Sequence, residues 1–122
     1  MDHSVLIVED VAETRLFIEH ILNELGFSHI DSAENGVQAA EKLNQHEYKL
    51  VMLDLELPDI DGKHLLDEYK LKYPDMLVII CSSHKTVENV KSTWDMGANG
   101  FLTKPVDLSK MQNLLSRVGL IK

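Results

Sequence analysis

Runs of consecutive apolar residues, each followed by a longer segment with helical spacing, are the feature that most restricts the fold of this chain. The runs at 5–8 (VLIV) and 50–53 (LVML) are apolar at every position, as expected of strands covered by protein on both faces. The first helical segment places its apolar residues at helical spacing: Leu16, Ile18, Ile21, Leu22 and Leu25. We expect strands at 4–8, 28–33, 49–53, 77–81 and 100–102, and helices at 11–25, 36–45, 62–72, 86–96 and 108–118.

Strict alternation of strand and helix predicts a parallel sheet, because right-handed crossovers through helices join parallel strands. Five strands and five helices fit an α/β, flavodoxin-like (βα)5 doubly wound sheet with strand order 2-1-3-4-5. Asn35 and Asp61 precede the second and third helices, and Gly26 and Gly97 follow the first and fourth, as is typical of helix ends. The 122 residues, without a linker or repeat, predict one domain over residues 1–122.

Net charge and cysteine content indicate which partners and which cellular compartment to expect for this chain. The formal net charge of -8 predicts no direct nucleic-acid contact, since a DNA-binding module carries a basic face. Cys81, the one cysteine, lies in an apolar run, which predicts a buried free thiol in a reducing compartment. The apolar run that stops at Glu9 is too short for a signal peptide or a membrane span. We therefore expect a cytoplasmic protein without a membrane partner.

Acidic residues directly follow two of the expected strands. Glu9 and Asp10 come after the first strand, and Asp54 comes after the third. These strands are neighbours where the strand order reverses, which is where open α/β sheets bind ligands. Carboxylates so close repel unless a cation lies among them, and oxygen ligands without cysteine or paired histidine favour Mg²⁺ or Mn²⁺. The alternative is that these acids only cap a helix or lie in solvent.

Hydroxyl groups and an ammonium group are expected at the same edge of the sheet. Ser82 and Ser83 follow the fourth strand, and Lys104 follows the fifth. Phosphoryl transfer needs an in-line nucleophile, together with positive charge and hydrogen-bond donors for the equatorial oxygens. Asp54 can be the nucleophile, Lys104 and a metal ion can neutralise oxygens, and Ser82 can donate a hydrogen bond. Taken singly, the lysine is typical of a solvated surface and the serine of a turn, so their joint placement supports the hypothesis.

As a set, these motifs resemble the receiver domain of two-component response regulators, single-domain chemotaxis regulators among them, over nearly the whole chain. The resemblance implies that Asp54 accepts a phosphoryl group from a sensor histidine kinase, a histidine phosphotransfer protein or a small acyl phosphate. It implies that Ser82 and Lys104 contact that group, with the choice between Ser82 and Ser83 left open. It further implies that Mg²⁺ is bound by Glu9, Asp10, Asp54 and the backbone carbonyl of Glu56. The motifs are Glu9-Asp10, Asp54-Leu55-Glu56-Leu57-Pro58 with Asp61-Gly62, Ser82-Ser83 and GANGFLTKP at 97–105.

The resemblance also implies a switch. Phe101 is similar to the aromatic switch residue of the family, although packing in the core is the alternative for it. Lys104 and Pro105 are similar to the family's cis-proline junction, and Glu56 and His84 to positions that modulate hydrolysis of the acyl phosphate. The expected partner surface, for an unknown downstream protein, is the fourth helix, fifth strand and fifth helix, with Lys110 and Arg117 as contacts to an acidic partner. Trp94 belongs either to that surface or to the core.

Other functions compete with this interpretation. A haloacid-dehalogenase-type phosphatase also uses a strand-end aspartate, but its nucleophile belongs on the first strand. A flavodoxin-like electron carrier needs a phosphate-binding loop after the first strand, where Glu9 and Asp10 repel phosphate. A pseudo-receiver keeps the fold as a binding module without phosphorylation. We expect a phosphoacceptor regulator that assists its own phosphorylation and dephosphorylation, not an enzyme acting on an external substrate.

Overall fold

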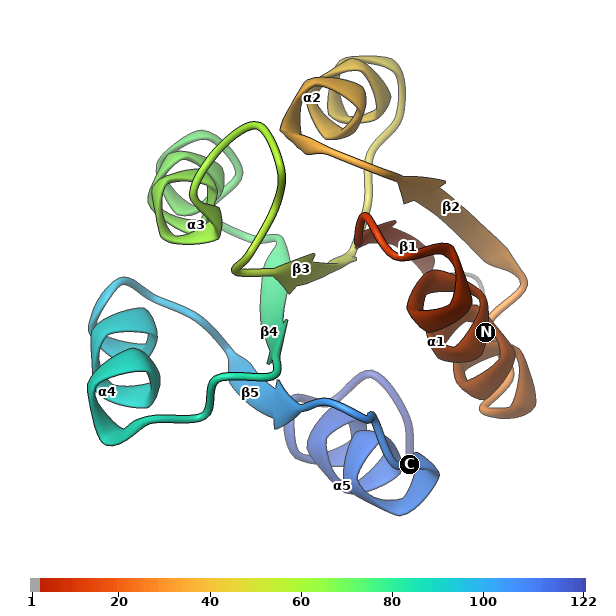
Figure 1. Cartoon of the computed structure of the whole chain (residues 1–122). Helices are drawn as coiled ribbons and strands as arrows, with labels where there is room; N and C mark the ends of the chain where they lie inside the picture. The colour runs from red at the N-terminus through yellow and green to blue at the C-terminus, as the bar shows by residue number, and fades with distance from the viewer. Residues whose placement is uncertain (1–2) are drawn as a thin grey trace.

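The structure is a computed structural model and describes residues 3–122, so residues 1 and 2 of the expected domain lie outside the described part. The strands are Ser4–Val8 (β1), His29–Ala33 (β2), Leu50–Asp54 (β3), Leu77–Ser82 (β4) and Gly100–Thr103 (β5). The helices are Ala12–Glu24 (α1), Gly36–Gln45 (α2), Gly62–Lys72 (α3), Val87–Asp95 (α4) and Leu108–Arg117 (α5). The strands form one parallel sheet in the order β2-β1-β3-β4-β5 (Figure 1). The predicted α/β class and strand order are confirmed, and each predicted boundary lies within one residue of the observed one.

Apolar layers enclose the sheet on both faces. Helices α1 and α5 cover one face, and α2, α3 and α4 cover the other (Figure 1). Side chains alternate between the faces along a strand, so Val5 and Ile7 join the core under α1 and α5, while Leu6 and Val8 join the core under α2 and α3. All four are 0% exposed. The consecutive apolar residues of the sequence are therefore explained by burial on both faces.

The predicted caps delimit the helices. The Asn35 side chain accepts a hydrogen bond from the Gln38 backbone N–H, and the Asp61 side chain accepts one from Lys63. Gly26 and Gly97 each have a φ of 100°, the left-handed region in which glycine is favoured after a helix. Within residues 3–122, no helix combines the length and the apolar character needed to cross a membrane.

Several large apolar side chains of the described residues are exposed, and two of them, Leu16 and Trp94, bear on the expectations from the sequence. Leu16 is 63% exposed, contrary to its inclusion in the apolar pattern of the first helix, because it lies about 200° around the helix from the buried Ile18. Trp94 is 68% exposed on α4. Of the two locations expected for it, the core and the surface, it therefore occupies the surface.

Candidate functional site

The carboxyl ends of β1 and β3 bring three carboxylates together. Val8 pairs with Leu53 across the two strands, so the residues that follow or end them are neighbours. Glu9, Asp10 and Asp54 each offer an oxygen, and these oxygens all lie within 4.8 Å of one another. Glu9 is 1% and Asp54 2% exposed, whereas Asp10 is exposed at the rim. The cluster forms at the edge that the strand order indicated.

Lys104 faces this cluster from the end of β5. Its ammonium contacts the Glu9 carboxylate and lies 3.3 Å from Asp54 Oδ1. The Lys104 backbone N–H donates to the Ser82 carbonyl at 2.9 Å, and the bond between Lys104 and Pro105 is cis, as the resemblance implies. One cation thus lies against two buried acids.

Burial is the largest influence on the pKa of the two buried carboxyls of the cluster. Loss of hydration raises the pKa of the Glu9 and Asp54 carboxyls, although Lys104 opposes the rise at both. Burial alone would lower the pKa of the Lys104 ammonium, but the Glu9 hydrogen bond and the Asp54 charge raise it overall. Buried acids with raised pKa values are costly in the folded state and are typical of functional sites.

Replacing Asp54 by asparagine is therefore expected to raise the free energy of unfolding at neutral pH by roughly 0.5–2 kcal/mol. Because folding raises the pKa of Asp54, the folded state binds more protons between the two pKa values, and stability falls as pH rises through that interval. The side-chain amide of the asparagine variant does not titrate. Its higher stability relative to wild type should therefore vanish below about pH 4, where the Asp54 carboxyl is protonated in the unfolded wild-type chain as well. Urea denaturation without divalent metal measures this, with Asp67→Asn on the exposed side of α3 as the control. An advantage that grows toward low pH contradicts the expectation.

Ser82 ends β4 inside the site, and Ser83 does not. Ser82 is 0% exposed, and its hydroxyl lies 3.0 Å from both carboxylate oxygens of Glu56. The His84 backbone N–H donates to Ser82 Oγ at 3.0 Å, and His84 Nδ1 lies 3.1 Å from Glu56 Oε1. Ser83 is exposed and lines a shallow depression with Lys104 and Pro105. Of the two serines, only Ser82 is buried beside the acidic site.

The loop between β3 and α3 fixes the backbone beside Asp54. The Glu56 N–H donates to Asp54 Oδ1 at 3.1 Å, and the Gly62 N–H donates to the Leu55 carbonyl at 3.0 Å. The Asp59 carboxylate accepts from the Gly36 N–H at 2.9 Å and so joins this loop to the start of α2. Backbone hydrogen bonds from Gly36 and Val37 lower the pKa of the Asp59 carboxyl.

Asp59 was missed by sequence reasoning. Its partner lies 23 residues away, and no local pattern joins them. The cap signal at Asn35-Gly36 marks where an acidic side chain is favourable, but only the fold brings Asp59 there. Asn99 was also missed: its side-chain oxygen accepts from the Val78 N–H and the Lys70 ammonium at 2.9 and 3.2 Å.

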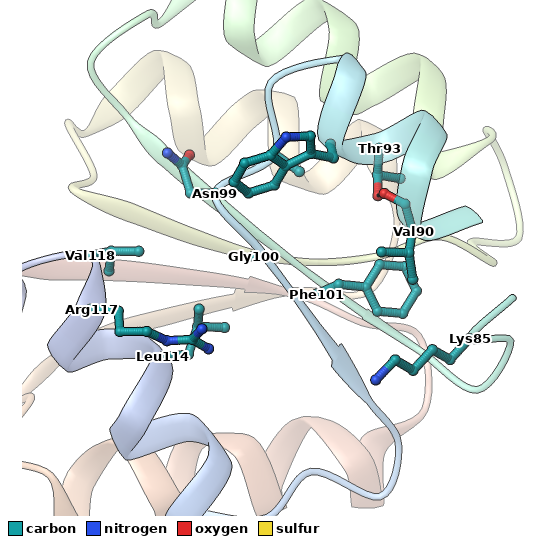
Figure 2. A pocket seen from close by; sticks show the side chains of 11 residues that line it. Lys85, Val90, Thr93, Asn99, Gly100, Phe101, Leu114, Arg117 and Val118 are labelled. Atoms are coloured by element: carbon teal, nitrogen blue, oxygen red, sulfur yellow. The ribbon is translucent and has the colours of Figure 1, made fainter. Parts of the chain in front are cut away.

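Phe101 lies away from the acids, in a groove between α4, β5 and α5. The ring is half-buried and packs against the core cluster under α2 and α3. It lines the groove with Val90, Trp94 and two cationic side chains, Lys85 and Arg117 (Figure 2). No residue of the acidic cluster lines this groove. Phe101 therefore lies on a surface separate from the acidic cluster, on β5, which β4 separates from β3.

The donor set of the acidic cluster fits a magnesium ion. The three converging side chains offer oxygen atoms only, and Mg²⁺ prefers carboxylate oxygens completed by water and phosphate oxygens. Two of the carboxylates are almost completely buried, where their mutual repulsion is strongest, and a divalent cation would offset it.

Comparisons with a family model and with known proteins all indicate the same family for this chain. The protein-family model described as the response regulator receiver domain matches residues 5–116 of this chain. The chain is 34% identical over 117 residues to the chemotaxis protein CheY of Bacillus subtilis, covering 96% of this chain and 98% of that one. It is also 34% identical to the chemotaxis protein CheY of Halobacterium salinarum, covering 97% and 98% of the two chains.

Solved protein structures also superpose on this chain. A chain in the crystal structure of the CheX-CheY-BeF3-Mg complex from Borrelia burgdorferi superposes with a TM-score of 0.89 at 30% identity, covering 95% of this chain and 88% of that chain. A CheY-like receiver domain protein from Methanospirillum hungatei superposes with a TM-score of 0.87 at 23% identity, covering 97% and 94%, which supports the fold alone.

Proposed function

Because this chain belongs to the response regulator receiver domain family, we propose that it is a phosphoacceptor signalling domain in which Asp54 carries the phosphoryl group. The observation that carries this proposal is the position of Asp54: a carboxylate 2% exposed at the end of β3, with an ammonium 3.3 Å from its Oδ1 and two further acids beside it. Family membership favours this function over the haloacid-dehalogenase and flavodoxin alternatives.

The proposed donor is a phosphohistidine of a sensor histidine kinase or histidine phosphotransfer protein, or a small acyl phosphate. A carboxylate oxygen of Asp54 attacks phosphorus, the bond from phosphorus to the donor's imidazole nitrogen breaks, and that nitrogen keeps the electron pair. The product is an acyl phosphate. Lys104 can move from Asp54 Oδ1 to the transferred phosphoryl oxygens, and the Ser82 hydroxyl can donate to another. Attack by water later releases inorganic phosphate and restores the carboxylate.

Glu9, Asp10, Asp54 and the Glu56 carbonyl would hold Mg²⁺, which supplies positive charge that reduces repulsion between the carboxylate and the incoming phosphoryl oxygens. The Borrelia burgdorferi complex, which contains BeF3 and magnesium, supports the same chemistry here. The chain has no external substrate in this proposal, so it is a regulator that assists its own phosphorylation and dephosphorylation.

The proposed output surface is the groove between α4, β5 and α5, which serves an unknown downstream protein. Lys85 and Arg117 line it together with Phe101 (Figure 2), and Lys110 is exposed on α5. These cations favour an acidic partner surface. Phosphoryl contacts at Ser82 and Lys104 pull on the ends of β4 and β5. β5 lines this groove, and the loop after β4 leads to Lys85 and α4, which line it as well.

Incubation with acetyl phosphate tests the proposal. In the presence of Mg²⁺ the protein should gain one phosphoryl group, detected by intact mass and removed by alkaline hydroxylamine, as an acyl phosphate is. Omission of the metal should greatly slow the gain. No incorporation, or a product stable to hydroxylamine, would refute the phosphoacceptor role.

Replacing Asp10 by asparagine is expected to weaken Mg²⁺ binding about tenfold, because it removes one of the converging carboxylates. Calorimetric titration of the unphosphorylated protein measures the affinity. Asp95→Asn, the same change at the exposed far end of α4, should leave it unaltered. Equal loss in the two variants would indicate only a general effect of charge.

A further inference from the structure

The Ser82 hydroxyl already has an anionic partner in this structure. Its oxygen is completely buried and lies 3.0 Å from each carboxylate oxygen of Glu56. A carboxylate accepts hydrogen bonds only, as phosphoryl oxygens do, whereas a hydroxyl has a single hydrogen to donate. Ser82 can therefore donate to Glu56 or to a phosphoryl group on Asp54, but not to both.

We propose that the Glu56 side chain is an internal competitor of the phosphoryl group: it holds the Ser82 hydroxyl in the resting state, and phosphorylation must displace it. The proposal rests on the phosphoacceptor function of Asp54. It concerns the Glu56 carboxylate, which is separate from the backbone carbonyl assigned to the metal.

Two observations show how displacement can occur. The Glu56 side chain is 43% exposed, so its carboxylate can turn into water without losing hydration. Glu56 also lies beside Asp54, since its N–H donates to Asp54 Oδ1 at 3.1 Å. A phosphoryl group on Asp54 adds negative charge at that position and repels the carboxylate while it takes the hydroxyl.

The same contact joins the site to α4. His84 contacts both members of the pair, through its N–H to Ser82 Oγ and its Nδ1 to Glu56 Oε1. The His84 carbonyl accepts from the Asn89 side chain at 2.9 Å and from the Thr86 N–H at 3.1 Å, and Thr86 caps α4. Release of Glu56 therefore removes a constraint on the segment that begins α4, and the resting conformation of that segment is stabilised by Glu56.

Beryllofluoride with Mg²⁺, a mimic of the phosphoryl group, provides the test by titration into four proteins: wild type, Glu56→Ala, Ser82→Ala and the double variant. Glu56→Ala should bind the mimic about tenfold more tightly, because a hydrogen bond to a charged group no longer has to be broken. In the Ser82→Ala background the same substitution should change affinity by less than about twofold. Glu41→Ala, an equal change of charge and size on the exposed side of α2, is the matched control and should stay within about twofold of wild type.

The outcomes separate competition from simple repulsion between charges. A gain that persists undiminished without the Ser82 hydroxyl shows repulsion alone and overturns the proposal. Glu56→Gln, which keeps a neutral acceptor, should fall between wild type and Glu56→Ala. In the free Glu56→Ala protein, amide NMR signals of His84 to Asn89 should move toward their mimic-bound positions; unmoved signals also contradict the proposal. If wild type does not bind the mimic at all, the phosphoacceptor function itself fails.

Discussion

Asp54→Asn protein is expected to take up no phosphoryl group from acetyl phosphate and Mg²⁺ under conditions that label the wild-type chain to completion. The amide oxygen carries no negative charge and is a poor nucleophile at phosphorus. Glu9 and Asp10 lie in the same cluster, but Glu9 is buried against Lys104 and Asp10 is at the rim. Intact mass before and after alkaline hydroxylamine measures the occupancy.

Asp67→Asn is the matched control for this substitution. Asp67 is exposed on α3, outside the acidic cluster, so its variant should be labelled as the wild type is. The Asp54 variant is also expected to unfold at higher urea concentrations at neutral pH, which separates loss of the nucleophile from loss of the fold. Full labelling of the Asp54 variant would move the phosphoacceptor role to another residue.

Gly62→Ala is expected to lower the free energy of unfolding by about 2–3 kcal/mol, the range of a misfit in a packed interior. A Cβ atom at this position would lie 2.5 Å from the Asp54 carbonyl oxygen and 2.5 Å from Leu55 Cα. Both are backbone atoms that cannot rotate away, so the loop after β3 must shift. Because that backbone also positions Asp54 and Glu56, phosphorylation should slow as well. Urea denaturation and the rate of labelling measure the two effects.

Gly119→Ala provides the comparison. Gly119 has a φ of 86° and no heavy atom within 4 Å of an added Cβ, so alanine there meets only backbone strain, about 1–2 kcal/mol. It follows α5 near the end of the chain and should leave labelling unchanged. Equal labelling rates in the two variants would indicate that the Gly62 contact does not position the site.

The fold could be predicted from the sequence because its strongest determinant is local and repeated. Leu6 and Ile7 are apolar neighbours that point to opposite faces of the sheet, and both faces are covered. Helix caps such as Asn35 act within three residues and are equally readable. The converging acids followed from strand order alone, since the ends of neighbouring parallel strands meet at one edge.

Side-chain partners between distant loops could not be predicted in this way. Glu56 and Ser82 are 26 residues apart, and their contact depends on the path of two loops and a side-chain rotamer. The burial of Ser82 rather than Ser83 also needed the structure: β4 runs one residue further than expected, and Ser82 pairs with Thr103 inside the sheet. Leu16 shows that a local pattern can also mislead. It is apolar but exposed, because apolar character alone does not decide which side of a helix is buried.

Because Trp94 is exposed, its fluorescence can report on the groove between α4, β5 and α5. Trp94 is the only tryptophan of the chain, and the residue is 68% exposed at the groove between α4, β5 and α5. An indole in water fluoresces at longer wavelength than one covered by protein, so a partner docked on this groove should shift the emission to the blue. Docking on the groove can therefore be titrated with the unlabelled protein, using a partner that lacks tryptophan.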